Sequence, residues 1–276
     1  MRKKGFNIFL YLILSISAVV FIAPIVIVGY NSLKNKLFIM SDPFALPDST
    51  TFDGENYIRG IVKSDLIASF SRSLFITVLS VGLIVLCSSM AAWYIIRRGS
   101  RLCRTIYYIL VFSMVVPFQM VMYTMTNVVM RLSLNNPIGI VFVYLGFGAG
   151  LSVFMYSGFV KSVPLALEEA AMIDGCSPLQ TFFKIVFPVL RPITVTVAIL
   201  ETMWVWNDYL LPYLTLGSQN KTLPVAIQLA MQGAYGAVDW GSFMAMLVIA
   251  IIPIIIFYLI GQKYIINGVV AGAVKG

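Results

Sequence analysis

Few residues of this chain belong to the types that carry out chemistry. The sequence has no histidine, and its three cysteines, Cys87, Cys103 and Cys176, are far apart. Metal and redox sites need Cys or His at short spacings, so neither kind of site is expected. No GxxxxGK[ST] segment, which would hold the phosphates of a nucleotide, occurs either. The sequence therefore predicts no catalytic residue, no metal and no cofactor bound by this chain.

The longest polar interruption in the second half is KSVPLALEEAAMIDGCSPLQTFFKIVFPVLRP (161–192). Pro164 suits the first turn of a helix, and Leu165 to Asp174 are good helix formers. Two glutamates stand near the start of that helix, where the helix dipole favours acids. Gly175 can adopt the positive φ that ends a helix. These signals predict a short helix that ends in a tight turn.

A second helix is predicted directly after this turn. Ser177 fits the N-cap, Pro178 the first helical position and Gln180 the reciprocal position of a capping box. The helix should continue to about Val186 and stop before Pro188, because the residue before a proline disfavours the α conformation. The segment is therefore expected to be two short helices that lie outside the bilayer core.

Two acids, Glu201 and Asp208, interrupt the long apolar run 192–220. A charge at mid-membrane costs about 2.5–3.5 kcal/mol on insertion scales, so each needs a partner or an aqueous environment. Glu201 lies ~14 Å into the predicted span, near the midplane. It is expected to face other helices or a polar path. Trp204 and Trp206 are interpreted as interfacial belt residues or as surfaces on which a sugar could stack.

The elements that position these residues are membrane helices. Hydrophobic residues make up 60% of the 276, charged residues only 11%, and the mean hydropathy is +0.93. Soluble domains carry roughly 25% charged residues, so an all-α integral membrane protein is predicted. The net charge of +8 reflects basic residues beside apolar runs, and no nucleic-acid partner is expected.

A bilayer core of ~30 Å needs ~20 apolar residues in a helix, and this requirement predicts six transmembrane helices. Continuous runs of this kind exclude a β-barrel, whose strands would alternate over ~10 residues. The apolar run near the N-terminus is longer than a signal peptide's and is read as an uncleaved first span. The expected spans are at about 8–30, 71–96, 105–127, 138–160, 193–214 and 242–263.

Orientation follows from the basic residues beside the spans, above all the short segment RRGSRLCR (97–104). This bias predicts that both termini and the segment 161–192 face the cytosol. The segment 31–66, on the other side, is rich in Pro, Asp and Ser and is expected to be irregular. We divide the chain into a first helix with this outer loop (1–70) and a five-helix core (71–276).

The segment 161–192 resembles the EAA motif of permease subunits of binding-protein-dependent ABC importers. That pattern is E-A-A, three residues, G, nine residues, I, one residue, L and P. Phe187 replaces the usual Leu, and Asp174 before the glycine matches a common form. The residues at the motif spacings are Glu169, Ala170, Ala171, Gly175, Ile185 and Pro188.

This resemblance implies a type I ABC importer permease fold in the bacterial cytoplasmic membrane. It also implies that the loop, with Glu168 and Glu169 near its start, docks into a groove of an ATP-binding subunit. The expected partners are a second homologous permease subunit, two ATP-binding subunits, an extracytoplasmic sugar-binding protein and the lipid bilayer. ATP and Mg²⁺ would be bound by the ATP-binding partner, which would carry out the hydrolysis.

The last third resembles the carbohydrate-uptake branch, within it the maltose-type second permease family. The segments that carry this likeness are WNDYLLPYLTL (206–216), 222–246 and 261–276. The resemblance implies a subunit that forms half of a path for a sugar, with an oligosaccharide favoured over a monosaccharide. The alternative is a secondary carrier for a small polar solute. The single membrane glutamate and the absence of an evident internal repeat argue against that alternative.

Three further groups of residues are candidates with two interpretations each. Glu201, Asn207 and Asp208 line the path, or Glu201 forms an internal hydrogen bond where the two permeases meet. The resemblance implies that the loop 217–240, with Gln228, Gln232 and Tyr235, reaches into the binding protein; the other interpretation is a lid on the helix bundle. The resemblance also implies that the C-terminal tail, with Lys275 and Gly276, enters the interface of the ATP-binding subunits; the other interpretation is a frayed end.

Overall fold

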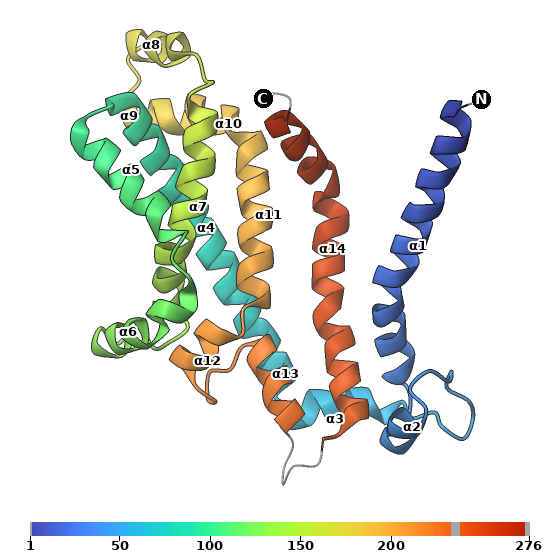
Figure 1. Cartoon of the computed structure of the whole chain (residues 1–276). Coiled ribbons are helices and arrows are strands. Elements are labelled where there is room, and N and C mark those ends of the chain that lie inside the picture. Colours follow the sequence, from blue (N-terminus) through green and yellow to red (C-terminus); the bar gives the residue numbers. More distant parts are fainter. Residues whose placement is uncertain (1, 233–237, 274–276) are drawn as a thin grey trace. The chain divides into compact units, whose positions relative to one another are not determined.

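The computed structural model describes residues 2–232 and 238–273 and is helical almost throughout (Figure 1). Within these ranges there is no strand, and Lys34 and Phe52 form one isolated antiparallel bridge. The helices are α1 (Arg2–Asn31), α2 (Lys36–Ser41), α3 (Glu55–Lys63), α4 (Leu66–Arg98), α5 (Arg101–Ser113), α6 (Phe118–Arg131), α7 (Gly139–Val160), α8 (Leu165–Ile173), α9 (Pro178–Thr181), the π-helix η1 (Phe182–Val186), α10 (Phe187–Val189), α11 (Arg191–Asn207), α12 (Leu210–Leu216), α13 (Leu223–Gln232) and α14 (Trp240–Ala273).

Four described segments are single helices that are long and apolar enough to cross a membrane: Asn7–Asn31, Leu66–Arg98, Gly139–Val160 and Trp240–Gln262. The total reaches six if each of two bent helix pairs counts as one span. The all-α membrane fold is therefore confirmed, with four to six candidate spans. The predicted spans 105–127 and 193–214 are not single helices.

The third predicted span, 105–127, is two helices. α5 ends at Ser113, α6 begins at Phe118, and their axes differ by 108°. Pro117 lies at the break in an extended conformation, with ψ at 133°. A proline has no N–H to donate and disfavours the α conformation in the residue before it, so it favours a break here, although α1 and α14 continue through Pro24 and Pro253.

The fifth predicted span, 193–214, is also interrupted. α11 ends at Asn207, and Asp208 adopts an extended conformation with ψ at 122°. The carboxylate of Asp208 then accepts hydrogen bonds from the backbone N–H groups of Leu210 and Leu211, at 3.0 and 3.4 Å. Asp208 thus follows the last residue of α11, and its carboxylate binds the first two N–H groups of α12, whose N-cap residue is Tyr209.

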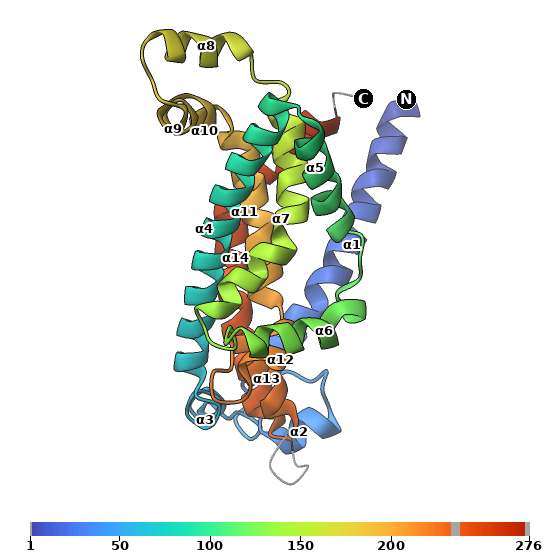
Figure 2. The same cartoon turned by 90° about the vertical axis from the view of Figure 1, so that its left-hand side faces the viewer.

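The chain divides into two compact units, residues 1–68 with 226–253 and residues 69–225 with 254–276. In the second unit, α5 and α11 pack against α7. A Cβ atom at Gly150 of α7 would lie 2.6 Å from the Leu110 carbonyl oxygen of α5, so only glycine allows this approach. α8, α9 and α10 lie at one end of this unit, and α6 and α12 lie at the other (Figures 1 and 2).

The segment 31–66, predicted to be irregular, contains the helices α2 and α3 in the first unit. Local capping explains α2, because the Asn35 side chain accepts a hydrogen bond from the Leu37 N–H at 3.1 Å. The ammonium of Lys34 is buried and donates to the carbonyl oxygens of Asp42 and Ala45, at 2.7 and 2.9 Å. These two hydrogen bonds hold the chain that follows α2 in place. The sequence analysis did not predict them because they join residues 8 and 11 positions apart.

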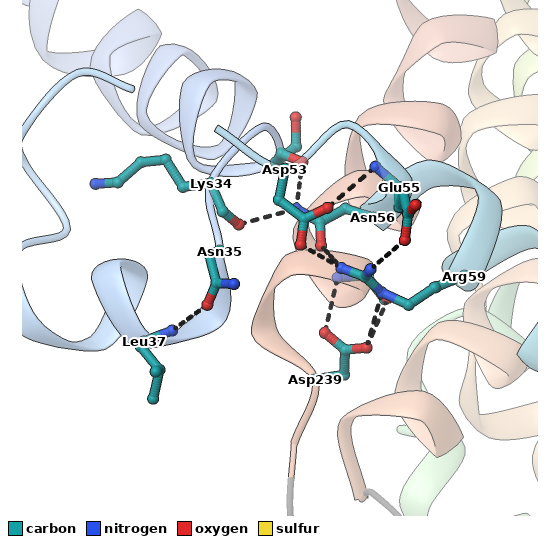
Figure 3. A network of polar contacts seen from close by, with 10 residues as sticks. Lys34, Asn35, Leu37, Asp53, Glu55, Asn56, Arg59 and Asp239 are labelled. Atoms are coloured by element: carbon teal, nitrogen blue, oxygen red, sulfur yellow. Dashed lines mark hydrogen bonds and ion pairs between the residues drawn. The ribbon is translucent and has the colours of Figure 1, made fainter. Parts of the chain in front are cut away.

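Arg59 of α3 is the centre of a polar cluster in the same unit (Figure 3). Its guanidinium contacts the carboxylates of Asp53 at 2.6 Å, Glu55 at 3.2 Å and Asp239 at 3.7 Å. The hydrogen bond to Asp53 is the main cause of its raised pKa. Asn56 accepts from Arg59 and donates to the carbonyl oxygens of Ser32 and Lys34. The cluster joins α3 to the segments that follow α1 and precede α14.

We predict that Arg59→Gln loosens this cluster, because it removes the cation that three carboxylates share. The expected cost is on the order of 1 kcal/mol, since the cluster is partly exposed. That cost corresponds to about fivefold faster cleavage of the segment 42–54 by chymotrypsin. Lys36→Gln, which removes an exposed charge nearby, is the control. Equal cleavage rates in the two variants would contradict this assignment.

Candidate functional site

The segment 161–192 forms two short helical arms joined by a tight turn. α8 begins after Pro164 and ends at Ile173, as predicted. Gly175 has φ at +82°, the left-handed conformation that the prediction required. The Gly175 N–H donates to the Met172 carbonyl at 3.1 Å and the Cys176 N–H to the Ala171 carbonyl at 2.9 Å. These two bonds form the Schellman motif that ends many helices.

The second arm begins with the predicted capping box. The Gln180 N–H donates to Ser177 Oγ at 3.3 Å, and the Ser177 N–H donates to Gln180 Oε1 at 2.8 Å. The prediction that this arm stops before Pro188 is wrong. The chain continues through one π-helical turn, in which the Phe187 N–H donates to the Phe182 carbonyl, and then through α10. This wider turn accommodates the missing N–H of Pro188.

Glu168 is buried in this segment, although it lies on a helix that is mostly exposed. Its side chain is 3% exposed and forms an ion pair with Arg97 of α4, with Arg97 Nη2 2.7 Å from Glu168 Oε1. Arg97 Nε donates to the same oxygen at 2.9 Å, and Trp93 Nε1 donates to Glu168 Oε2 at 2.9 Å. Glu168 therefore bonds inside its own chain, whereas its neighbour Glu169 is exposed.

The other residues at the motif spacings divide into exposed and buried positions. Ala170, Asp174, Gly175 and Pro188 are exposed, Ala171 is buried, and Ile185 is half-buried. Large apolar side chains share the exposed surface, and Ile173 is the most accessible of them at 86%. The other exposed large apolar residues of the segment are Leu165, Leu167, Met172, Leu179, Phe183 and Val189.

Sequence reasoning missed the roles of Trp93, Arg97 and Ile173. Arg97 had entered only as one of several basic residues that indicate orientation. Arg97 could have been identified by pairing an acidic residue near the start of α8 with a basic residue at the end of another span. Ile173 lies within the motif at a position where the pattern accepts any residue. The motif spacing therefore did not identify it as a candidate.

Glu201 of α11 is buried and accepts a hydrogen bond from Ser152 Oγ of α7 at 2.8 Å. The two helices approach closely here, because a Cβ atom at Gly148 of α7 would lie 3.0 Å from Glu201 Oε2 and 2.7 Å from Ile84 Cδ1. An oxygen of Glu201 thus has a polar partner within the chain. This geometry favours a helix-joining role for Glu201.

Asp208 joins the same pair of helices two turns further along. The hydroxyl of Tyr144 on α7 donates to Asp208 Oδ2 at 3.0 Å, and Tyr144 packs edge-to-face with Trp204 at 5.4 Å. Trp206 is buried and packs edge-to-face against Phe70 at 5.5 Å. α7 and α11 are therefore held together by two carboxylates, each of which accepts a hydroxyl hydrogen bond.

The remaining predicted residues lie apart from these sites or outside the described side chains. Asn207 is exposed and donates to the Met203 carbonyl at 2.7 Å. Gln228 is half-buried on α13. The side chain of Gln232 and all of Tyr235, Lys275 and Gly276 lie outside the described residues.

Among the described side chains, no three Cys, Asp or Glu residues lie close enough to hold a metal ion. The cysteines Cys87, Cys103 and Cys176 are free thiols. What the described parts of the chain do present is a bent, capped and partly apolar surface at one end of α4 and α7, together with two polar helix contacts inside the bundle. The exposed surface is suited to binding another protein, and the two polar contacts hold neighbouring helices of the bundle together.

Comparison with known proteins agrees with this architecture. Residues 84–270 match the family described as binding-protein-dependent transport system inner membrane component. The probable starch degradation products transport system permease protein of Thermoanaerobacterium thermosulfurigenes is 39% identical over 99% of this chain and 97% of that relative. The chain therefore belongs to this family of inner membrane transport components. It is a multi-pass protein of the bacterial plasma membrane.

A further relative and a solved structure are matched over most of their length. The multiple sugar-binding transport system permease protein of Streptococcus mutans is 37% identical, over 96% of each chain. A crystal structure of a bacterial ABC transporter involved in the import of the acidic polysaccharide alginate has a chain with the same fold. It matches at a TM-score of 0.82 and 24% identity, over 96% of this chain and 98% of that one. The comparisons do not support the alternative of a secondary carrier.

We predict that Gly175→Val disrupts the turn, whereas Gly175→Asn preserves it. An L-residue in the left-handed conformation costs about 1–2 kcal/mol, and asparagine tolerates it best. Nothing lies within 4 Å of a Cβ atom at Gly175, so the effect comes from the backbone alone. Hydrogen exchange at the Cys176 amide should be about tenfold faster in the valine variant. Equal exchange in the two variants would rule out the positive φ as the reason for glycine.

Proposed function

We propose that this chain is a permease subunit of an ATP-driven sugar importer, and that it forms half of the translocation path. Family membership and the names of the relatives support this proposal. Those names refer to starch degradation products in one relative and to multiple sugars in another. A third, the trehalose/maltose permease protein of Thermococcus litoralis, is 34% identical over 80% of this chain. An oligosaccharide is accordingly the substrate class that we favour.

The observation that carries the proposal is the exposed apolar surface on the capped segment 161–192. Leu165, Met172, Ile173 and Leu179 are exposed there, beside the polar residues Glu169 and Asp174. Exposed apolar side chains within a polar rim mark protein interfaces. We name this surface, defined by these six residues, the coupling surface, and we assign an ATP-binding subunit as its partner.

In this proposal the coupling surface and both termini face the cytosol, where ATP is available. The basic segment 97–104, at the same end of α4 as the coupling surface, supports that orientation. The sequence carries no GxxxxGK[ST] segment. In this proposal ATP and Mg²⁺ bind to two ATP-binding subunits, which hydrolyse the nucleotide, and the role of this chain is transport.

The sugar reaches the path from an extracytoplasmic binding protein. The loop 217–240, with Gln228, Gln232 and Tyr235, is the proposed contact with that protein, because amide and hydroxyl groups can exchange hydrogen bonds with sugar hydroxyls. A second, homologous permease subunit supplies the other half of the path. The tail with Lys275 and Gly276 contacts the ATP-binding subunits.

The coupling surface can be tested by co-purification. We predict that Ile173→Asp greatly reduces recovery of the ATP-binding subunit when the two chains are expressed together, because it places a charge in the centre of an apolar contact. Glu169→Gln should weaken the same association less. Membrane insertion, measured by fractionation, should be unchanged in both variants, since these residues lie outside the spans.

Leu132→Asp is the matched control, because Leu132 is an exposed apolar residue at the opposite end of the same unit. This variant should retain the ATP-binding subunit. If the Ile173→Asp complex forms at the level of the unsubstituted chain, the coupling surface is wrongly assigned. If the unsubstituted chain retains no ATP-binding subunit, the proposed function itself fails.

A further inference from the structure

Glu168 and Glu169 are adjacent in the sequence but have opposite surroundings. Glu169 is exposed on the coupling surface, whereas Glu168 is buried against α4. A buried carboxylate is costly unless it is paired and hydrogen-bonded. Glu168 meets both conditions through bonds to Trp93 and Arg97 on its two oxygens, between 2.7 and 2.9 Å. We call Trp93, Arg97 and Glu168 the α4–α8 cluster.

Arg97 also holds the chain that leads into α8. Its Nη2 donates to the carbonyl oxygen of Val163 at 2.9 Å, in addition to its contact with Glu168. The guanidinium therefore fixes the start of α8 at two points, one on the backbone and one on a side chain. A lysine could not reproduce this arrangement, because it offers a single charged nitrogen in place of a rigid fork.

Trp93 connects the same cluster to the second arm of the segment. Its indole N–H bonds to Glu168 of α8, and its ring packs against Phe182 of η1, with centroids 5.4 Å apart. Phe182 is completely buried and contacts the rings of Phe183 and Phe187. One end of α4 thus holds both arms, α8 through polar bonds and η1 through aromatic packing.

We propose that the α4–α8 cluster is the mechanical connection through which movement of the docked ATP-binding subunit reaches α4. This inference rests on the proposed function and adds positioning residues to it. On α8, Glu169 and Ile173 of the coupling surface are exposed, whereas Glu168 of the cluster is buried. A force on the surface moves α4 only if α8 cannot tilt independently, and the buried bonds of Glu168 prevent such tilting. α4 is a single helix through Arg98, so a displacement at its end is carried along it.

The test uses the complete complex with its permease partner, ATP-binding subunits and sugar-loaded binding protein, reconstituted in lipid vesicles. Glu168→Gln keeps the shape of the side chain and an acceptor for Trp93 but removes the ion pair. We expect assembly to be retained and the stimulation of ATP hydrolysis by the loaded binding protein to fall about tenfold, within the range of allosteric couplings. Uptake of labelled sugar per ATP hydrolysed should fall as well.

Two further variants separate coupling from general damage. Arg98→Gln removes a positive charge from the next, exposed residue of α4 and should behave as the unsubstituted chain. The exchanged pair Arg97→Glu with Glu168→Arg should recover part of the stimulation that each single substitution loses, because it restores opposite charges at these positions.

Unchanged stimulation and uptake in Glu168→Gln would overturn the inference. So would loss of assembly in that variant, because the ion pair would then be needed to build the docking surface and not to transmit movement. The unsubstituted complex is measured first. If its ATP hydrolysis does not respond to the loaded binding protein, the proposed function itself is wrong.

Discussion

The ion pair between Arg97 and Glu168 is the interaction on which the arrangement of the segment 161–192 depends. It joins residues 71 positions apart and holds α8 against α4, while Trp93 extends the same contact to the aromatic residues of η1. Without it, the Schellman turn and the capping box would still form, because both are local. The second arm would stay attached to the membrane helices through the buried residues Phe182, Val186 and Leu190, whereas α8 would lose its fixed position against α4.

Further along the same unit, contacts of a different kind join α7 to its neighbours. Gly150 allows α5 to approach, and Gly148 allows the approach of Ile84 and Glu201. The carboxylates of Glu201 and Asp208 accept hydrogen bonds from α7 where the helices meet. In a membrane, where no hydrophobic force drives helices together, small residues and polar bonds of this type supply much of the specificity. The proposed translocation path is therefore bordered by helices that specific contacts hold together.

Much of the fold and part of the site could be predicted from the sequence because the responsible forces act over short distances. Apolar runs fixed the positions of the spans, and Gly175, Ser177 and Gln180 fixed the turn and cap of the segment 161–192. The missing N–H of Pro117 favours the break there but does not decide it, because α1 and α14 continue through Pro24 and Pro253. The π-helical turn before Pro188 was harder, since a proline more often ends a helix than widens it.

The contacts between distant segments could not be derived in this way. Nothing in EEAA (168–171) indicates that its first glutamate is buried and its second exposed, because the difference arises from Trp93 and Arg97 on another helix. Likewise, Arg59 of α3 forms an ion pair with Asp239, far along the chain. The ammonium of Lys34 donates to carbonyl oxygens in a segment that was expected to be irregular. Long-range pairing decides these positions.

The central claim is that α8 and α4 move as one body, and a distance measurement tests it most directly. Spin labels would be placed at Leu167 on α8, outside the coupling surface, and at Val78 on α4, both exposed, in a chain whose three cysteines are replaced by alanine. The account predicts that the distance between the labels stays within about 2 Å when the complex passes from the nucleotide-free to the ATP-bound state. A change on the order of 5 Å, one helical turn, would contradict it.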